Sequence, residues 1–133
     1  TFGMADRVRF AEIDSLNHVN NVVYLRWYET LRVNYMDHYG IYDVAGPDPK
    51  FVVKTVGLDY QAEVMRGAPY INVARTVAMR NTSFVMEYAT FVDGKITTTG
   101  TAVVVILNAD SSKRPLTGAL RQILIERDGA VQA

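Results

Sequence analysis

The segment from Asp14 to Asn21 carries the residues best suited to chemistry. It reads DSLNHVNN, and a long helical pattern begins where it ends. Asn20 is a suitable N-cap, which leaves the backbone N–H groups of Asn21, Val22 and Val23 without partners inside the helix. Free N–H donors at the positive end of a helix stabilise an anion or a developing oxyanion. A carboxylate such as that of Asp14, aimed at a carbonyl held by these donors, can perform acyl transfer.

Each titratable residue of this region also has a structural interpretation. Asp14 precedes a helix, where aspartates commonly cap or turn a loop. His18 suits general base catalysis near neutral pH, but its side chain can equally pack in the turn and hydrogen-bond a backbone carbonyl. His38 lies near the end of the helical pattern, where packing explains it. Because the only histidines are at positions 18 and 38 and there is no cysteine, we expect no metal site.

The helical pattern from about Asn21 to Tyr39 has to position these groups. Its apolar side chains cover a wide arc, and a helix that is apolar over most of its circumference is expected to be buried. Glu29 interrupts a second apolar strip, and we expect it to pair with Arg26 or Arg32 or to anchor the backbone. The wide arc contains Val23, Tyr24, Trp27, Tyr28, Leu31, Tyr35 and Tyr39, and the second strip contains Val22, Leu25, Val33 and Met36.

The remaining chain is typical of strands. An alternation of apolar and polar residues predicts a strand over Asp6–Glu12, and Ala45–Lys50, with two prolines and a glycine, predicts a loop. Asp93-Gly94 is a strong signal for a two-residue hairpin. The order of strand, buried helix, four strands and terminal helix favours an α+β domain with an antiparallel sheet wrapped around one helix. The four later strands are expected at about 56–63, 71–79, Ser83–Val92 and Lys95–Leu107, and the terminal helix after Pro115.

Length and charge restrict the class of protein. The 133 residues support one domain over residues 1–133. Fourteen basic and fourteen acidic side chains leave no net charge, which argues against a nucleic-acid partner. No apolar run approaches the roughly 18–20 residues that span a bilayer, so we expect no membrane segment. The N-terminus lacks the features of a signal peptide, and the absence of cysteine fits a reducing compartment; we therefore expect a cytoplasmic protein.

A resemblance to a known family joins these features. The stretch Asp14–Glu29, DSLNHVNNVVYLRWYE, resembles the signature of the 4-hydroxybenzoyl-CoA thioesterase branch of the hot-dog superfamily, and it is also similar to plant fatty acyl-ACP thioesterases. The resemblance continues through LDYQAEV at Leu58–Val64 and RPL at Arg114–Leu116. It implies the hot-dog fold, in which a five-stranded antiparallel sheet wraps around a long central helix. It also implies hydrolysis of an acyl-CoA or acyl-carrier-protein thioester without a cofactor.

The resemblance implies roles for individual residues. The aspartate at the position of Asp14 acts as nucleophile or general base, and the backbone N–H of Asn21 polarises the thioester carbonyl. His18 matches a histidine of the plant enzymes and is a second catalytic candidate. Leu16 stands where those enzymes carry asparagine, which favours chemistry centred on Asp14. The residues expected to contact the substrate are Asn20, Val22, Tyr24, Trp27 and Tyr28, and the basic residues that could meet CoA phosphates are Lys54, Arg66, Arg80, Lys113 and Arg114.

The resemblance also bears on assembly and on rival functions. In this fold family the site usually forms between two subunits, which implies a homodimer or a dimer of dimers. An enoyl-thioester hydratase or dehydratase needs a differently placed histidine with a carboxylate, and the chain has no such motif. A non-catalytic acyl-CoA-binding module is the other alternative, and Asp14 beside a free helix start argues against it. The sequence does not identify the acyl group.

Overall fold

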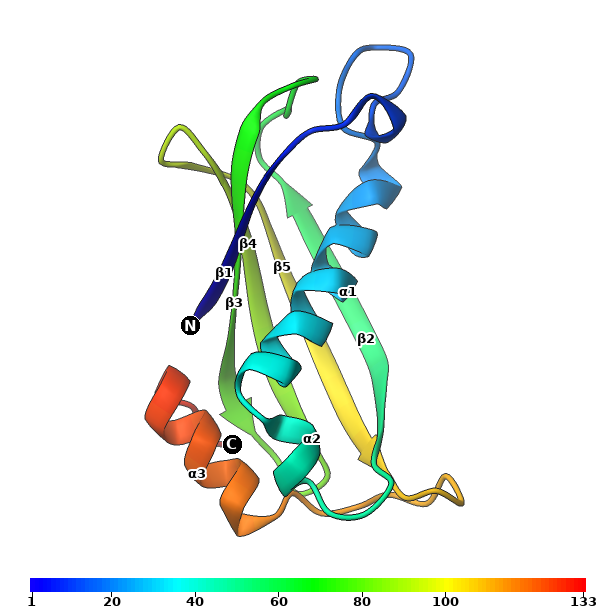
Figure 1. The fold of residues 1–133 in the computed structure, drawn as a ribbon, viewed down its shortest axis with the longest axis vertical. Helices are drawn as coiled ribbons and strands as arrows, with labels where there is room; N and C mark the ends of the chain where they lie inside the picture. Colours follow the sequence, from blue (N-terminus) through cyan, green and yellow to red (C-terminus); the bar gives the residue numbers. More distant parts are fainter.

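An antiparallel sheet curves around the long helix α1 (Asn21–His38) in the computed structural model, which describes residues 1–133 (Figure 1). The strands lie in the order β1-β3-β4-β5-β2, and a short β6 pairs in parallel with β3. This arrangement confirms the predicted α+β hot-dog architecture. The strands are β1 (Phe2–Arg7), β2 (Lys50–Tyr60), β3 (Pro69–Met79), β4 (Ser83–Val92), β5 (Lys95–Leu107) and β6 (Val131–Gln132), and the shorter helices are α2 (Ile41–Val44) and α3 (Gly118–Asp128).

No helix of the chain has both the length and the apolar character needed to cross a membrane.

The first strand lies earlier in the chain than predicted. The prediction of a strand over Asp6–Glu12 is wrong, because one turn of 3-10 helix occupies Phe10–Glu12. The side chain of Glu12 produces this turn: its Oε1 accepts the backbone N–H of Arg9 at 2.8 Å, and the N–H of Glu12 donates to the carbonyl of Arg9 at 3.0 Å. Its Oε2 accepts the indole N–H of Trp27 at 2.6 Å, which connects the turn to α1.

Helix α1 is buried on one side only. Three members of the second apolar strip lie on the opposite side, where Val22, Leu25 and Val33 are 57%, 41% and 44% exposed, whereas the fourth, Met36, is buried. The expectation that the helix is buried over most of its circumference is therefore wrong, because a single sheet covers a single side. The buried side chains of α1 are Val23, Tyr24, Trp27, Tyr28, Leu31, Tyr35 and Met36.

Glu29 lies on this exposed side and makes no ion pair, so the expected pairing with Arg26 or Arg32 is absent. Arg32 instead donates to the hydroxyl of Tyr88 on β4 at 3.2 Å. A carboxylate in water does not need a partner, and this removes the reason for expecting one.

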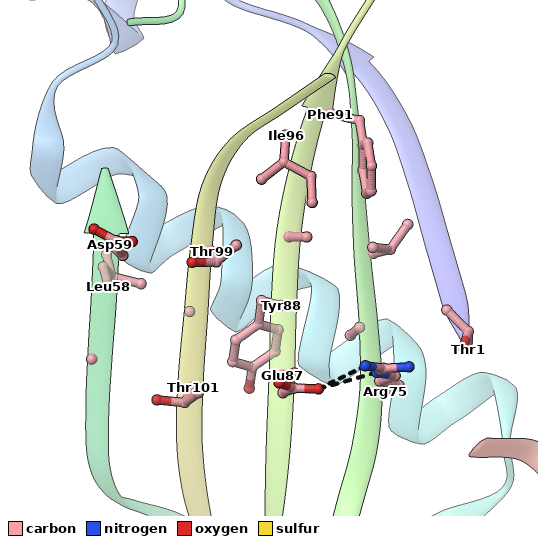
Figure 2. Close-up of a pocket in the computed structure, with 15 residues that line it drawn as sticks. Thr1, Leu58, Asp59, Arg75, Glu87, Tyr88, Phe91, Ile96, Thr99 and Thr101 are labelled. Atoms are coloured by element: carbon pink, nitrogen blue, oxygen red, sulfur yellow. Dashed lines mark hydrogen bonds and ion pairs between the residues drawn. The ribbon is translucent and has the colours of Figure 1, made fainter. Parts of the chain in front are cut away.

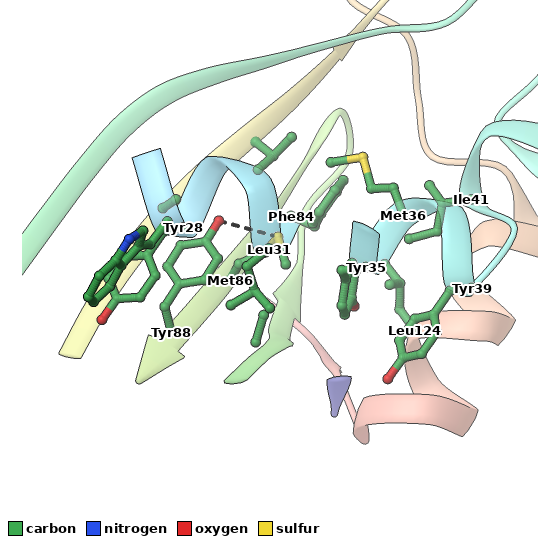
Figure 3. Packing of buried hydrophobic residues seen from close by; sticks show 14 of the residues in the cluster. Tyr28, Leu31, Tyr35, Met36, Tyr39, Ile41, Phe84, Met86, Tyr88 and Leu124 are labelled. Carbon is green, nitrogen blue, oxygen red and sulfur yellow. Dashed lines mark hydrogen bonds between the residues drawn. The ribbon is translucent and has the colours of Figure 1, made fainter. Parts of the chain in front are cut away.

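Tyrosine hydroxyls connect the buried side of α1 to the sheet. The hydroxyls of Tyr28 and Thr90 lie 2.8 Å apart, and those of Tyr35 and Thr76 lie 2.7 Å apart. Tyr28 also stacks on Tyr88 with ring centroids 4.9 Å apart (Figure 3). These contacts fix both the rotation of α1 and its distance from the strands, because a buried phenol needs a hydrogen-bond partner.

A buried carboxylate holds the other end of the molecule together. The side chain of Asp128, at the end of α3, is fully buried. It accepts the hydroxyl of Tyr35 at 2.5 Å, the hydroxyl of Tyr39 at 3.1 Å and the backbone N–H of Thr76 at 2.7 Å. Three donors on two other elements thus fasten α3 to the C-terminal end of α1 and to β3.

The buried tyrosines predict a loss of stability in alkali. Burial raises the pKa of Tyr28 and of Tyr39 to about 12 and raises that of Tyr35 as well. In the unfolded chain these phenols ionise near their ordinary pKa of about 10. Their contribution is complete below about pH 10, and the free energy of unfolding should fall as pH rises from about 10 to about 12, because only the unfolded state releases protons there.

Urea unfolding at several values between pH 9 and pH 12 measures this slope. Tyr28→Phe should make it shallower while costing about 1 kcal/mol at pH 8 through the lost hydrogen bond to Thr90. A wild-type stability that stays constant to pH 12 would contradict the prediction.

Candidate functional site

The carboxylate of Asp14 organises the loop before α1. Its Oδ1 accepts the backbone N–H groups of Leu16 at 2.9 Å and His18 at 3.2 Å, and the Asp14 N–H donates to the carbonyl of His18 at 2.8 Å. Between them Asn17 adopts a φ of 64°, a conformation that asparagine tolerates better than most residues. Asp14 is exposed, and its Oδ2 has no hydrogen-bond donor within the chain. One oxygen shapes the loop and the other is free.

The start of α1 leaves one backbone donor open. The side chain of Asn20 accepts the N–H of Val22 at 3.0 Å, and its carbonyl accepts the N–H of Val23 at 2.9 Å. The expectation of three open groups is therefore corrected to one, the N–H of Asn21, which has no acceptor in the chain. The hydroxyl of Tyr60 donates to the carbonyl of Asn21 at 2.9 Å and ties this helix start to the end of β2.

A pocket of about 270 Å³ brings these groups together. Asp14, His18, Asn21 and Tyr24 all line it, and residues 60–64 close its other side. The sequence did not indicate Tyr60 as a site residue. The alternation of apolar and polar residues around Tyr60 predicted only a strand. A local pattern cannot reveal the contact between Tyr60 and Asn21, which are 39 positions apart.

His18 is turned toward the strand end rather than toward the carboxylate. Its Nε2 lies 3.2 Å from Oε2 of Glu63, and its side chain is 24% exposed. No hydrogen bond joins the ring to the Asp14 side chain; only the backbone N–H of His18 contacts it. When protonated, His18 forms an ion pair with Glu63, so the structure gives the ring a partner other than Asp14. No cluster of three or more His, Cys, Asp or Glu side chains is arranged to hold a metal ion.

Four other residues expected to contact substrate lie outside the pocket lining. Asn20 caps α1 with its side chain, and Val22 is on the exposed side of the helix. Trp27 stacks on Tyr70 with centroids 4.1 Å apart and donates to Glu12, on the side of α1 that faces β3. The hydroxyl of Tyr28 is hydrogen-bonded to that of Thr90 in the core.

The basic candidates are spread over the molecule. The guanidinium of Arg66 lies 5.2 Å from the ring of Phe10 and two residues after Val64, which lines the pocket. Arg114 is engaged elsewhere, since it donates to Asn108 at 2.7 Å and to the carbonyl of Ala45 at 3.0 Å. Arg80 and Lys113 lie at the opposite end of the sheet, and Lys54 lies at the irregularity in the middle of β2.

Larger hollows lie on the outer face of the sheet. One of about 640 Å³ is lined by apolar side chains such as Phe91 and Ile96 and crossed by the Arg75–Glu87 ion pair at 2.9 Å (Figure 2). Another is about 950 Å³. The charges of Arg75 and Glu87 neutralise each other. Helix α1 lies on the opposite face of the sheet from these hollows. Neither hollow reaches the open N–H of Asn21, and the candidate site is therefore the smaller pocket.

Known proteins share the sequence pattern and the fold of this chain. The family model described as thioesterase-like superfamily matches residues 8–123. A thioesterase-superfamily protein from Jannaschia sp. CCS1 is 41% identical, with a TM-score of 0.89 over 100% of this chain and 86% of that one. A thioesterase from Thermus thermophilus, solved with coenzyme A and zinc, is 28% identical, with a TM-score of 0.83 over 96% of this chain and 94% of that one. A search of curated proteins gave no match.

Proposed function

This chain belongs to the thioesterase-like superfamily and is a thioester hydrolase, and we propose that its substrate is an acyl-CoA hydrolysed at the pocket beside Asp14. One observation carries the proposal: Asp14, whose Oδ2 accepts no hydrogen bond, and Asn21, whose N–H has no acceptor, line the same pocket. The relative from Thermus thermophilus, solved with coenzyme A, supports the CoA thioester over the carrier-protein thioester.

The two groups divide the chemistry between them. The thioester carbonyl oxygen accepts the N–H of Asn21, and the positive end of α1 stabilises the charge that develops on that oxygen. Oδ2 of Asp14 then attacks the carbonyl carbon and expels the CoA thiolate, and water hydrolyses the resulting anhydride. In the alternative step, Oδ2 takes a proton from the water molecule that attacks. Both steps use the oxygen that the loop leaves free.

Replacing Asp14 tests this assignment. Asp14→Asn should lower kcat by a factor of about one hundred or more, because the amide is neither a nucleophile nor a base. The fold should persist, since the amide oxygen can still accept the N–H groups of Leu16 and His18. Release of free thiol from a panel of acyl-CoAs measures turnover.

Asp37→Asn is the matched control, because it removes an exposed carboxylate from the far end of α1 and should leave kcat unchanged. His18→Ala should cost about tenfold if the ring only shapes the loop. Near-wild-type turnover by well-folded Asp14→Asn would refute the assignment, and a loss by His18→Ala equal to that of Asp14→Asn would make His18 a catalytic partner.

Arg66 is the basic residue best placed to meet the phosphates of CoA. It lies two residues after the pocket-lining segment, and it makes no salt bridge. The ring of Phe10 below it is 72% exposed and offers a flat apolar surface beside the cation.

Arg66→Gln should therefore raise KM for acyl-CoA about tenfold with little change in kcat, because one charge-assisted contact is lost. The kcat/KM for the same acyl group on pantetheine, which lacks the nucleotide, should not change. Arg80→Gln, at the opposite end of the sheet, is the control. An unchanged KM for acyl-CoA in Arg66→Gln would show that Arg66 does not contact the substrate. If the wild-type enzyme preferred acyl-carrier-protein thioesters over acyl-CoA, the proposed CoA substrate would be wrong.

We also propose that the site is shared between two copies of the chain. The outer edge of β2 has no neighbouring strand over its 11 residues, and a long free edge favours pairing with another strand. Val56 and Tyr60, on the strand that ends at the pocket, are 47% and 44% exposed. Pairing of two β2 strands about a two-fold axis covers these residues and brings the partner's side chains to the pocket. A dimer of dimers keeps the same shared site.

Sedimentation velocity combined with activity on serial dilution tests the shared site. Specific activity should fall as the dimer dissociates, in proportion to the monomer fraction. A monomer that retains full specific activity would contradict the model.

A further inference from the structure

A phenol from the sheet reaches the backbone of the helix start. The hydroxyl of Tyr60, the last residue of β2, donates to the carbonyl of Asn21 at 2.9 Å. Both residues line the candidate pocket, one from the strand and one from α1, and both lie at the end of the molecule away from α2 (Figure 1). The bond therefore connects two walls of the pocket.

Neither group requires this bond to be satisfied. Only the last four carbonyl groups of a helix lack a partner within it, and Asn21 is the first residue of α1. Tyr60 is exposed, so water can satisfy its hydroxyl. A hydrogen bond of this kind adds little to stability, because it replaces bonds to water. What the bond adds is a fixed position of the helix start relative to the strand.

The contacts around Tyr60 hold its ring in place. The chain that follows it is fastened to β5, since the backbone N–H groups of Gln61 and Ala62 donate to the carbonyl of Thr97 at 2.9 and 3.0 Å. Its ring meets that of the buried Tyr24 edge to face, with centroids 5.4 Å apart. The hydroxyl is therefore carried by a strand end and a ring that are both held.

The bond acts on the residue that carries the open donor. The carbonyl of Asn20 accepts the N–H of Val23 at 2.9 Å, and its side chain accepts the N–H of Val22 at 3.0 Å. The N–H of Asn21 has no acceptor, and Tyr60 holds the carbonyl of this same residue. A donor stabilises an oxyanion only at about 2.7–3.1 Å from it, so a small displacement of Asn21 lowers the rate.

We propose that Tyr60 is a positioning residue for the hydrolysis: its hydroxyl holds Asn21 where the open N–H meets the carbonyl oxygen of the thioester. A tyrosine hydroxyl has a single donor, and the carbonyl of Asn21 takes it. Tyr60 therefore acts through Asn21 and does not itself donate to the substrate. This inference rests on the proposed acyl-CoA hydrolysis at Asp14 and Asn21.

Tyr60→Phe tests the inference, because it removes the hydroxyl and keeps the ring. The kcat for acyl-CoA should fall about tenfold with little change in KM, because the donor is misplaced in the transition state while the rest of the substrate still binds. The Tm should fall by no more than about 5 °C, since one exposed hydrogen bond is lost. Tyr42→Phe is the matched control: Tyr42 is also exposed, but it lies on α2, so kcat should not change.

Two inhibitors separate the position of the donor from a general loosening of the site. An acyl-CoA analogue with a trifluoromethyl ketone in place of the thioester forms a tetrahedral adduct, whose oxygen should accept the N–H of Asn21. Its inhibition constant should rise about tenfold in Tyr60→Phe. An S-alkyl-CoA thioether has no carbonyl oxygen, so its inhibition constant should be the same in both proteins.

Tyr60→Leu separates the hydroxyl from the packing of the ring. It removes the contact with Tyr24 as well, so its Tm should fall further than that of Tyr60→Phe. Its kcat should nevertheless be similar to that of Tyr60→Phe, because both variants lack the hydroxyl. A kcat that falls only in Tyr60→Leu would assign the effect to ring packing and overturn the proposal.

The role of Tyr60 and the proposed function fail in different ways. A wild-type kcat in folded Tyr60→Phe, or an equal rise in the inhibition constants of the two inhibitors, would overturn the role of Tyr60. Near-wild-type turnover by Asp14→Asn would instead overturn the hydrolysis at Asp14 on which it rests.

Discussion

The structure depends on the requirement that each phenol buried under α1 has a polar partner. An apolar helix can rotate or slide on a sheet at small cost, but a buried hydroxyl without a partner costs about 1–3 kcal/mol. Tyr28 and Tyr35 meet this requirement at two points along the helix, with Thr90 and Thr76. Two directional contacts fix the helix on the sheet, and they also decide where its first residue lies.

The loop before that first residue makes the two interpretations of Asp14 compatible. In the structural interpretation Oδ1 of Asp14 turns the loop, and in the chemical interpretation Oδ2 reacts. The two interpretations therefore concern different oxygens of the same side chain. Asn20 reduces the number of open donors at the helix start. Its side chain and carbonyl accept two of the three backbone N–H groups expected to be open, and only the N–H of Asn21 is left without an acceptor. The local hydrogen bonds thus leave one oxygen of Asp14 and one backbone donor of Asn21 without partners, and both residues line the same pocket.

Features that depend on local pattern could be predicted from the sequence. The strands Ser83–Val92 and Lys95–Leu107 have the expected bounds, because Asp93-Gly94 determines the turn between them. The helix and its buried arc follow from periodicity, and so does the place of Asp14 before it. Features that depend on distant contacts were missed or wrong. The turn at Phe10–Glu12 forms because the Glu12 side chain caps it, and Tyr60 reaches the site only through the folding of β2 over α1. The exposure of the second strip of α1 could not be predicted from the sequence. Periodicity shows which side of a helix is apolar, but it does not show whether another layer of the fold covers that side.

Hydrogen bonds hold α1 at both of its ends. Tyr60 holds the carbonyl of Asn21 at one end, while Asp128 holds Tyr35 and Tyr39 at the other. The two sets of contacts act on one continuous helix of roughly 27 Å. The C-terminal segment, which carries no residue of the pocket, therefore helps to fix the helix whose first residue lines the pocket. A substitution at Asp128 would therefore alter the support of the helix without changing any residue that lines the pocket.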